Sequence, residues 1–314
     1  MRQSVHNRIS EPGGQYFRSA IIGVILTASA APSPMRSSAI TPVVPLRPVL
    51  ANVGFASPEN LVYDASHKVY LVSNMNGDPR ARDANGFVSR VSADGKLLTL
   101  KWIDGSRPGT RLDAPKGLAI RGDTLAVADV GCVRLFSLQT GASLGVWKAP
   151  GVLLNDVAFS PDGALYVTDT GADSGKTDPN DRDAVFRFTV ADHPTRVIAG
   201  TALSGPDGIV ASDTGFTYST FKSDLVEHVA RSGARTTIAT LPGAKVDGLR
   251  RLSDGSLVVT SWNAHSVFRI APEGKMTVVA SGINSPAGVT YDAAQHRLAI
   301  TSMNGNSMYF VTLP

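Results

Sequence analysis

Six repeats in the chain each place one residue at the start of an apolar strand, where its side chain could do chemistry. Carboxylate and amide oxygens suit a hard divalent cation, Ca²⁺ above all, with Mg²⁺, Mn²⁺ or Zn²⁺ as alternatives. Acids brought together repel, so one takes up a proton unless a cation is present. In order along the chain, the six aligned positions hold Glu59, Lys116, Asn155, Asp207, Asp247 and Ala287.

The lysine leaves two arrangements open. One divalent ion together with the Lys116 ammonium would balance the three acids; alternatively, Lys116 alone pairs the acids and no metal binds. A third interpretation is that the Asp and Asn residues only bond to their own backbone in turns. Four acidic or amide residues at one repeat position favour a shared metal site formed by Glu59, Asn155, Asp207 and Asp247.

The segments that carry these residues share a pattern of strand, turn and second strand, followed by a third and a fourth strand. The segments begin at residues 58, 115, 154, 206, 246 and 286, so the repeats are 39 to 57 residues long. Four strands in a unit of about 40 residues are typical of a propeller blade. We therefore predict an all-β, six-bladed β-propeller with four antiparallel strands per blade over residues 45–314.

The last repeat has only three strands before the chain stops. The missing outer strand is expected from residues 45–53, which should pair with residues 306–313 and close the ring. A closed ring leaves only short, protected sheet edges.

Blade strands alternate in direction, so the starts of the innermost strands and the loops after the second strands share one face of the ring. Two of these loops, 74–86 and 169–184, are long and polar, as binding loops or lids often are. His265 is a candidate proton relay in a shorter loop. The expected substrate-binding residues are Lys116 of the ring and, from the loops, Asn74, Phe221, Trp262 and Asn263.

The N-terminal segment differs from the rest of the chain. Three arginines precede an apolar run at residues 20–26, and small residues follow at 28–31. This order is typical of a secretory signal, and the run is shorter than the roughly 20 residues of a membrane span. We expect a signal peptide at 1–30, a disordered linker at 31–44, and a periplasmic or secreted protein without a membrane span. A disordered tail with a chance apolar patch is the alternative.

Charge and cysteine content exclude several classes of partner. Removal of residues 1–30, which hold three Arg and one Glu, lowers the net charge from +4 to +2, and no Lys/Arg cluster indicates nucleic-acid binding. Cys132 is the single cysteine, so no internal disulfide can form. The fold must hold by packing, and we expect a monomer that acts on a small molecule.

Over residues 50–314, the chain resembles the senescence-marker-protein/gluconolactonase family of six-bladed propellers. The resemblance implies one divalent ion on the axis and hydrolysis of sugar lactones or related esters. Glu59, Asn155 and Asp247 match the family's ligand positions, while Asp207 stands where the family has Asn. The segments that carry the resemblance are SPENLVYD, LLNDVAFSPDGALYVTDT and VDGLRRLSDGSLVVTSWNAHSVFRIAPEGK.

Two departures bear on the substrate. Leu153 and Leu154 stand where the family commonly has an Arg that contacts substrate, and Lys116 matches no family position. The leading hypothesis is an exported, metal-dependent hydrolase in which the ion polarises the carbonyl and Asp247 orients or deprotonates water. The alternative is a non-enzymatic exported propeller that binds a small ligand or a protein partner on the same face.

Overall fold

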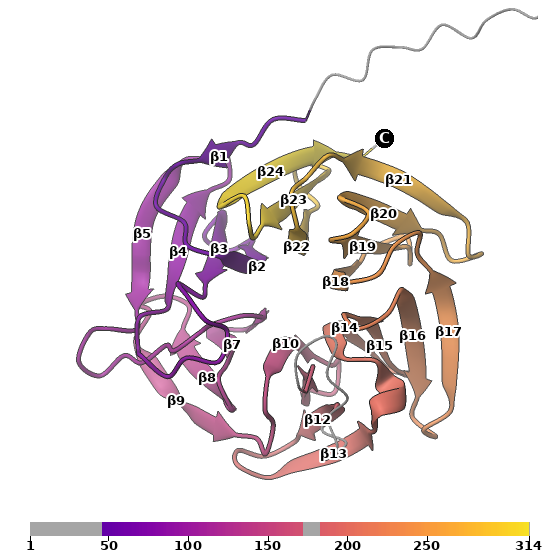
Figure 1. The fold of residues 1–314 in the computed structure, drawn as a ribbon. Helices are drawn as coiled ribbons and strands as arrows, with labels where there is room; N and C mark the ends of the chain where they lie inside the picture. Colours follow the sequence, from indigo (N-terminus) through magenta and orange to yellow (C-terminus); the bar gives the residue numbers. More distant parts are fainter. Residues whose placement is uncertain (1–45, 172–182, 314) are drawn as a thin grey trace, which may run out of the picture. The chain divides into compact units, whose positions relative to one another are not determined.

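The computed structural model describes residues 46–171 and 183–313, which form six four-stranded sheets around a common centre (Figure 1). The predicted all-β, six-bladed propeller with antiparallel blades is confirmed. The expected signal peptide (1–30) and linker (31–44) lie outside the described residues. Within the described ranges, no helix has the length and hydropathy needed to cross a bilayer.

Within each of the first five blades, the strands are numbered from the centre of the ring outward to its rim. The first blade contains β2 (Pro58–Asp64), β3 (Val69–Asn74), β4 (Phe87–Ser92) and β5 (Leu97–Asp104). The second contains β6 (Leu118–Arg121), β7 (Thr124–Asp129), β8 (Cys132–Ser137) and β9 (Ser143–Lys148). The third contains β10 (Leu154–Phe159), β11 (Leu165–Asp169), β12 (Ala184–Phe188) and β13 (Pro194–Ala199).

The remaining blades continue this order, after a short 3₁₀ turn at Thr201–Leu203. The fourth contains β14 (Pro206–Ser212), β15 (Gly215–Thr220), β16 (Leu225–Ala230) and β17 (Arg235–Thr240). The fifth contains β18 (Val246–Arg251), β19 (Leu257–Ser261), β20 (Ser266–Ile270) and β21 (Met276–Ser281). The sixth contains β22 (Pro286–Asp292), β23 (Arg297–Ser302), β24 (Ser307–Thr312) and, from the start of the chain, β1 (Leu50–Ala51).

The apolar core lies between neighbouring blades. Every residue of β3 and β11 is buried, whereas β9 at the rim alternates between exposed and half-buried residues. Leu165 and Phe186 of the third blade, for example, belong to one cluster with Ala126 of the second. Inner strands are covered on both faces by adjacent sheets, so they read as nearly continuous apolar runs.

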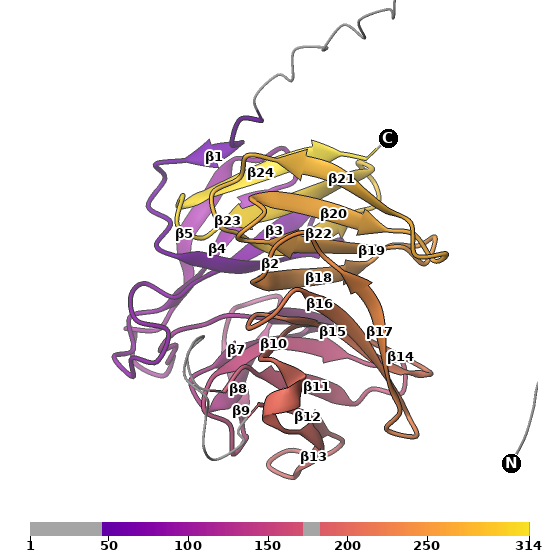
Figure 2. The same cartoon turned by 45° about the vertical axis from the view of Figure 1, so that its right-hand side comes forward.

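The ring is closed by β1, which pairs antiparallel with β24 at the rim of the sixth blade, as Figures 1 and 2 both show. Leu50 pairs with Met308, and the Val49 N–H donates a 2.8 Å hydrogen bond to the Met308 carbonyl. The strand is shorter than the expected 45–53 because Pro48 lacks an N–H and Asn52 (φ 57°) turns the chain away.

The inner strands are distorted where they carry the ring residues. In five blades the pairing of the first two strands is irregular just after the first residue of the inner strand, for example between Pro206 and Ile209. Such a bulge places extra residues on one strand and re-aims their side chains. The next position is tightly packed: a Cβ added to Gly208 would lie 2.5 Å from the Asp247 carbonyl oxygen.

The closure by β1 predicts a stability difference between two truncations. Removing residues 1–53 takes away the buried Leu50 and the backbone pairing to Met308, whereas removing residues 1–45 leaves both in place. We expect the longer truncation to lower the free energy of unfolding by about 3 kcal/mol relative to the shorter one. Urea denaturation measures this difference, and equal stabilities would contradict the assigned role of β1.

Candidate functional site

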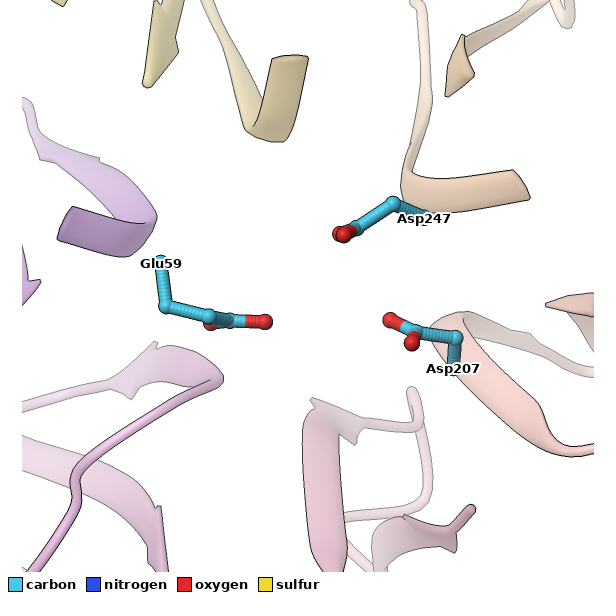
Figure 3. Close-up of side chains that lie close together, drawn as sticks. All are labelled: Glu59, Asp207 and Asp247. Carbon is cyan, nitrogen blue, oxygen red and sulfur yellow. The ribbon is translucent and has the colours of Figure 1, made fainter. Parts of the chain in front are cut away.

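Three carboxylates meet at the centre of the ring. Glu59 of β2, Asp207 of β14 and Asp247 of β18 point toward one another (Figure 3), although they lie far apart in the sequence. One carboxylate oxygen from each lies within 4.8 Å of those of the other two. The three residues are only 5%, 2% and 3% exposed, respectively.

The other members of the ring modify this cluster. Asn155 donates from Nδ2 to Oδ2 of Asp207 (2.7 Å) and to Oγ1 of Thr170 (3.0 Å). The Lys116 Nζ donates to the carbonyl oxygens of Pro79 (2.9 Å) and Ala114 (3.0 Å). Among the described residues, Lys116 forms no ion pair within 4.0 Å of a ring acid, so it does not pair the acids directly.

Burial and mutual repulsion set the protonation of the ring. Loss of solvation, followed by the negative charge of Asp247, raises the pKa values of Glu59 and Asp207 well above their usual range. Burial raises the pKa of Asp247 to about 8, against the opposing effect of the nearby Trp262 indole. Burial also lowers the pKa of Lys116 to about 8. The acids therefore favour protons unless a cation replaces them.

Polar atoms without partners face the same space. Oε2 of Glu59 and Oδ1 of Asn155 are buried acceptors that find no hydrogen-bond partner among the described residues. Nε1 of Trp262 is a buried donor that falls short of a hydrogen bond, although it lies close enough to Asp247 to lower that pKa. Buried polar atoms normally find partners, so orphaned acceptors beside three carboxylates fit a bound cation.

Residues one position further along the strands form a floor below the carboxylates. Asp156 accepts hydrogen bonds from Nδ2 of Asn60 (3.1 Å) and from the backbone N–H groups of Val157 (2.9 Å) and Ile209 (3.0 Å). It thereby joins the first, third and fourth blades across the centre. The remaining four positions at this level are glycines, which leave room for the close approach of the backbones.

Hydroxyl groups from the second strands fix the backbone of the three acids. Thr301 donates to the carbonyl oxygen of Glu59 (2.9 Å), and Thr168 donates to that of Asp207 (2.6 Å). Ser219 donates in the same way to the carbonyl oxygen of Asp247. Each of these bonds links one blade to the next, so the ligand positions are tied to the assembly of the ring.

A cavity of about 120 Å³ opens above the carboxylates. Phe221 and Trp262 meet edge to face, with ring centroids 5.2 Å apart, and Lys245 Nζ lies 5.6 and 5.5 Å from these two rings. The walls are mainly apolar and come from the ends of the inner strands and from the loops of the same face. They are formed by Met75, Pro79, Leu153, Thr170, Phe221, Trp262 and Met303.

Three residues considered from the sequence lie outside the cavity. Asn74 is fully buried, and its side chain is used within the blade: it accepts from the Ala56 N–H and donates to Val72 and Ser89. Asn263 and His265 are exposed in the turn between β19 and β20. Of the expected binding residues, Lys116, Phe221 and Trp262 line the cavity.

Several residues that shape the site were not predicted from the sequence. Part of the 169–184 loop lies outside the described residues, but Thr170 and, from the other long loop, Pro79 contact the cavity. The supporting hydroxyls do leave a signal in the sequence. One repeat position holds Ser or Thr in five of six blades, namely Ser73, Thr168, Ser219, Thr260 and Thr301.

Comparisons with known proteins agree with this architecture. A family model described as SMP-30/Gluconolactonase/LRE-like region matches residues 92–304. A gluconolactonase from Xanthomonas campestris is 21% identical with a TM-score of 0.64, over 83% of this chain and 87% of that chain. Virginiamycin B lyase from Staphylococcus aureus is 16% identical with a TM-score of 0.59, and the match covers 82% of this chain and 95% of the lyase. A search of curated protein sequences found no significant match. At these identities, the two structures indicate the fold alone.

The buried acids predict a pH-dependent stability in metal-free protein. Because the pKa of Asp247 rises from 3.8 to about 8 on folding, the folded state binds more protons than the unfolded state between these values. The free energy of unfolding should therefore fall as pH rises from about 4 to about 8, by on the order of a few kcal/mol. Denaturation in EDTA measures this slope. Excess Ca²⁺ should flatten the slope by keeping the acids ionised, and Asp207→Asn should reduce it by removing one buried acid. A flat profile in EDTA would contradict the burial of protonated acids in the ring.

Proposed function

The chain belongs to the SMP-30/gluconolactonase/LRE-like family, and from this premise we propose that it is a divalent-metal-dependent hydrolase of a lactone or related ester. The observation that carries the proposal is the set of three buried carboxylates beside two orphaned oxygen acceptors. A site with this composition attracts a cation, and the cavity above it leaves room for a small substrate.

Glu59, Asp207, Asp247 and Oδ1 of Asn155 would hold the cation. The carboxylate oxygens already lie within 4.8 Å of one another, close enough for one divalent ion to contact all three. Ca²⁺ accepts several carboxylate and amide oxygens directly, whereas Mg²⁺ usually keeps several waters, so a site of protein oxygens alone suits Ca²⁺. Three acids with Lys116 carry a net charge of −2, which one divalent ion neutralises. When bound, such an ion polarises a carbonyl group and acidifies water.

Three side chains around the cavity would act as the base and as hydrogen-bond donors to the substrate. Asp247 accepts the proton of the attacking water, because it is the acid beside the apolar wall formed by Trp262. The Trp262 N–H, which has no hydrogen-bond partner within residues 46–171 and 183–313, can donate to an oxygen of the substrate. An ammonium has three donors. Two of those of Lys116 bond to described residues, and the third can donate to the developing oxyanion.

The walls of the cavity favour a compact, apolar lactone over a polyhydroxylated sugar lactone. Met75, Leu153, Phe221 and Met303 offer hydrocarbon and thioether surface, and Leu153 stands where a substrate-binding Arg is common in the family. Sugar hydroxyls buried against such walls would each lose hydrogen bonds to water without replacement. His265, being exposed, has no part in this mechanism.

We further propose that the protein acts in the periplasm or outside the cell. This rests on the order of basic, apolar and small residues within residues 1–30, which is typical of a secretory signal. Extracellular sites for Ca²⁺ are commonly weak, and a site of four protein oxygens is suited to such an environment.

Loss of the base should abolish hydrolysis. We expect Asp247→Asn to lower kcat at saturating Ca²⁺ by at least about 100-fold with δ-valerolactone as substrate, since Asn cannot accept the proton. A pH-stat measures the acid released. Asp254→Asn, which changes an exposed Asp in a turn of the same blade, is the matched control and should retain full activity. Undiminished activity of Asp247→Asn would exclude its role as the base.

The apolar walls predict the order of substrates. The value of kcat/KM should be at least about tenfold higher for δ-valerolactone than for D-glucono-1,5-lactone, because buried hydroxyls without partners cost about 1–3 kcal/mol each. Phe221→Ala should lower kcat/KM for δ-valerolactone and leave that for the sugar lactone nearly unchanged. A preference for the sugar lactone would contradict the assigned substrate class while leaving the metal-dependent chemistry intact.

A further inference from the structure

A second and larger cavity, of about 590 Å³, lies at the opposite end of the inner strands. The carboxylates sit at the starts of these strands, whereas this cavity is lined by later residues, such as Val62 of β2, Ile120 of β6 and Val210 of β14. The floor formed by Asp156 and Asn60 lies between the two. The volume falls within the range of small-molecule sites.

The walls of this cavity are largely apolar. Besides the three aliphatic side chains above, Leu118 and the half-buried Phe159 contribute to it. These surfaces come from the first four blades and can bury a hydrocarbon body from several sides.

The charged groups of the cavity are mainly arginines without acidic partners. Arg250 is half-buried, and its Nε donates to the carbonyl oxygen of Val289 (3.2 Å). Its two Nη atoms make no hydrogen bond with the described residues, and no carboxylate among those residues lies within 4.0 Å. In the part of the chain that the structure describes, the neighbouring Arg251 likewise bonds only to a carbonyl, that of Gly255 (3.3 Å).

The two acids near Arg250 are already satisfied. Asp64, which also lines the cavity, accepts hydrogen bonds from Ser66 and His67. Asp156 accepts the three hydrogen bonds described above, from Asn60, Val157 and Ile209. The charge of Arg250 lowers the pKa of Asp156, but burial has the larger effect and raises it. The described lining residues carry one net positive charge next to an apolar wall, because Arg250 and Arg251 outnumber the carboxylate of Asp64.

We propose that this cavity binds a small organic anion, with its carboxylate on Arg250 and its apolar body against Val62, Ile120 and Phe159. The free Nη groups of Arg250 suit the bidentate binding of a carboxylate. Because the floor separates the two cavities, this site is independent of the proposed hydrolysis, and either proposal can fail without the other.

Calorimetric titration with hexanoate tests the proposal on the intact protein. We expect hexanoate to bind with one site per chain, and more tightly than either acetate, which lacks the apolar body, or hexan-1-ol, which lacks the charge. Arg250→Met should weaken the binding of hexanoate at least about tenfold, as expected for the loss of charge-assisted hydrogen bonds. Arg231→Met, at an exposed arginine outside the cavity, should bind hexanoate like the unmodified protein.

Two further variants keep the outcome decisive. Arg250→Lys retains the charge without the planar fork, so it should bind hexanoate with intermediate affinity if Arg250→Met fails to fold. Asp247→Asn should bind hexanoate normally, because it alters only the other cavity. The proposal is overturned by no binding of hexanoate up to about 10 mM, by equal binding of hexan-1-ol, or by binding that Asp247→Asn abolishes and Arg250→Met leaves unchanged.

Discussion

The central constraint on the site is that three carboxylates are held close together and out of water. Glu59, Asp207 and Asp247 come from different blades and are almost fully buried. Burial raises the pKa values of all three, and the negative charge of Asp247 raises those of Glu59 and Asp207 further. Charges in such surroundings are stable only with a partner of opposite sign. Lys116 lies in the same ring but donates its hydrogen bonds to two carbonyl groups, so it does not pair the acids directly, and their raised pKa values favour bound protons.

The surrounding fold acts against this repulsion. Bulges in the inner strands turn the acids toward the axis, and hydroxyls from adjacent blades hold their carbonyl groups in place. Asp156 and Asn60 meet below the acids, and β1 closes the ring at the rim. The hydroxyl bonds and the Asn60–Asp156 bond cross from one blade to another, and β1 joins the start of the chain to the last blade. The geometry of the site is therefore a property of the closed ring and not of a single blade.

Much of this arrangement could be predicted from the sequence, because each repeat corresponds to one blade and aligned positions lie at the same level of the ring. The strand pattern predicted six blades, and the alignment of the repeats predicted that Glu59, Asp207 and Asp247 meet. The repeats carry less information about which side chains beside the ring line the cavity. Asn74 was expected to bind substrate, and the structure places it as the last residue of β3, where its side chain bonds to Ala56 and Ser89. His265 follows the same strand as Trp262, but the turn (φ 50°) leaves it exposed while Trp262 reaches the cavity. The alternation of side chains within a strand is regular, but a turn of four residues has several ways to direct them.

The central claim is that a divalent cation replaces protons shared by the buried acids. Infrared difference spectroscopy of metal-free protein at neutral pH, before and after addition of Ca²⁺, measures this exchange directly. We expect the band of protonated carboxylic acids to disappear and the carboxylate bands to grow as one ion binds per chain, and we expect Glu59→Gln to diminish the change. An unaltered carboxyl spectrum with no bound ion at millimolar Ca²⁺ would contradict it.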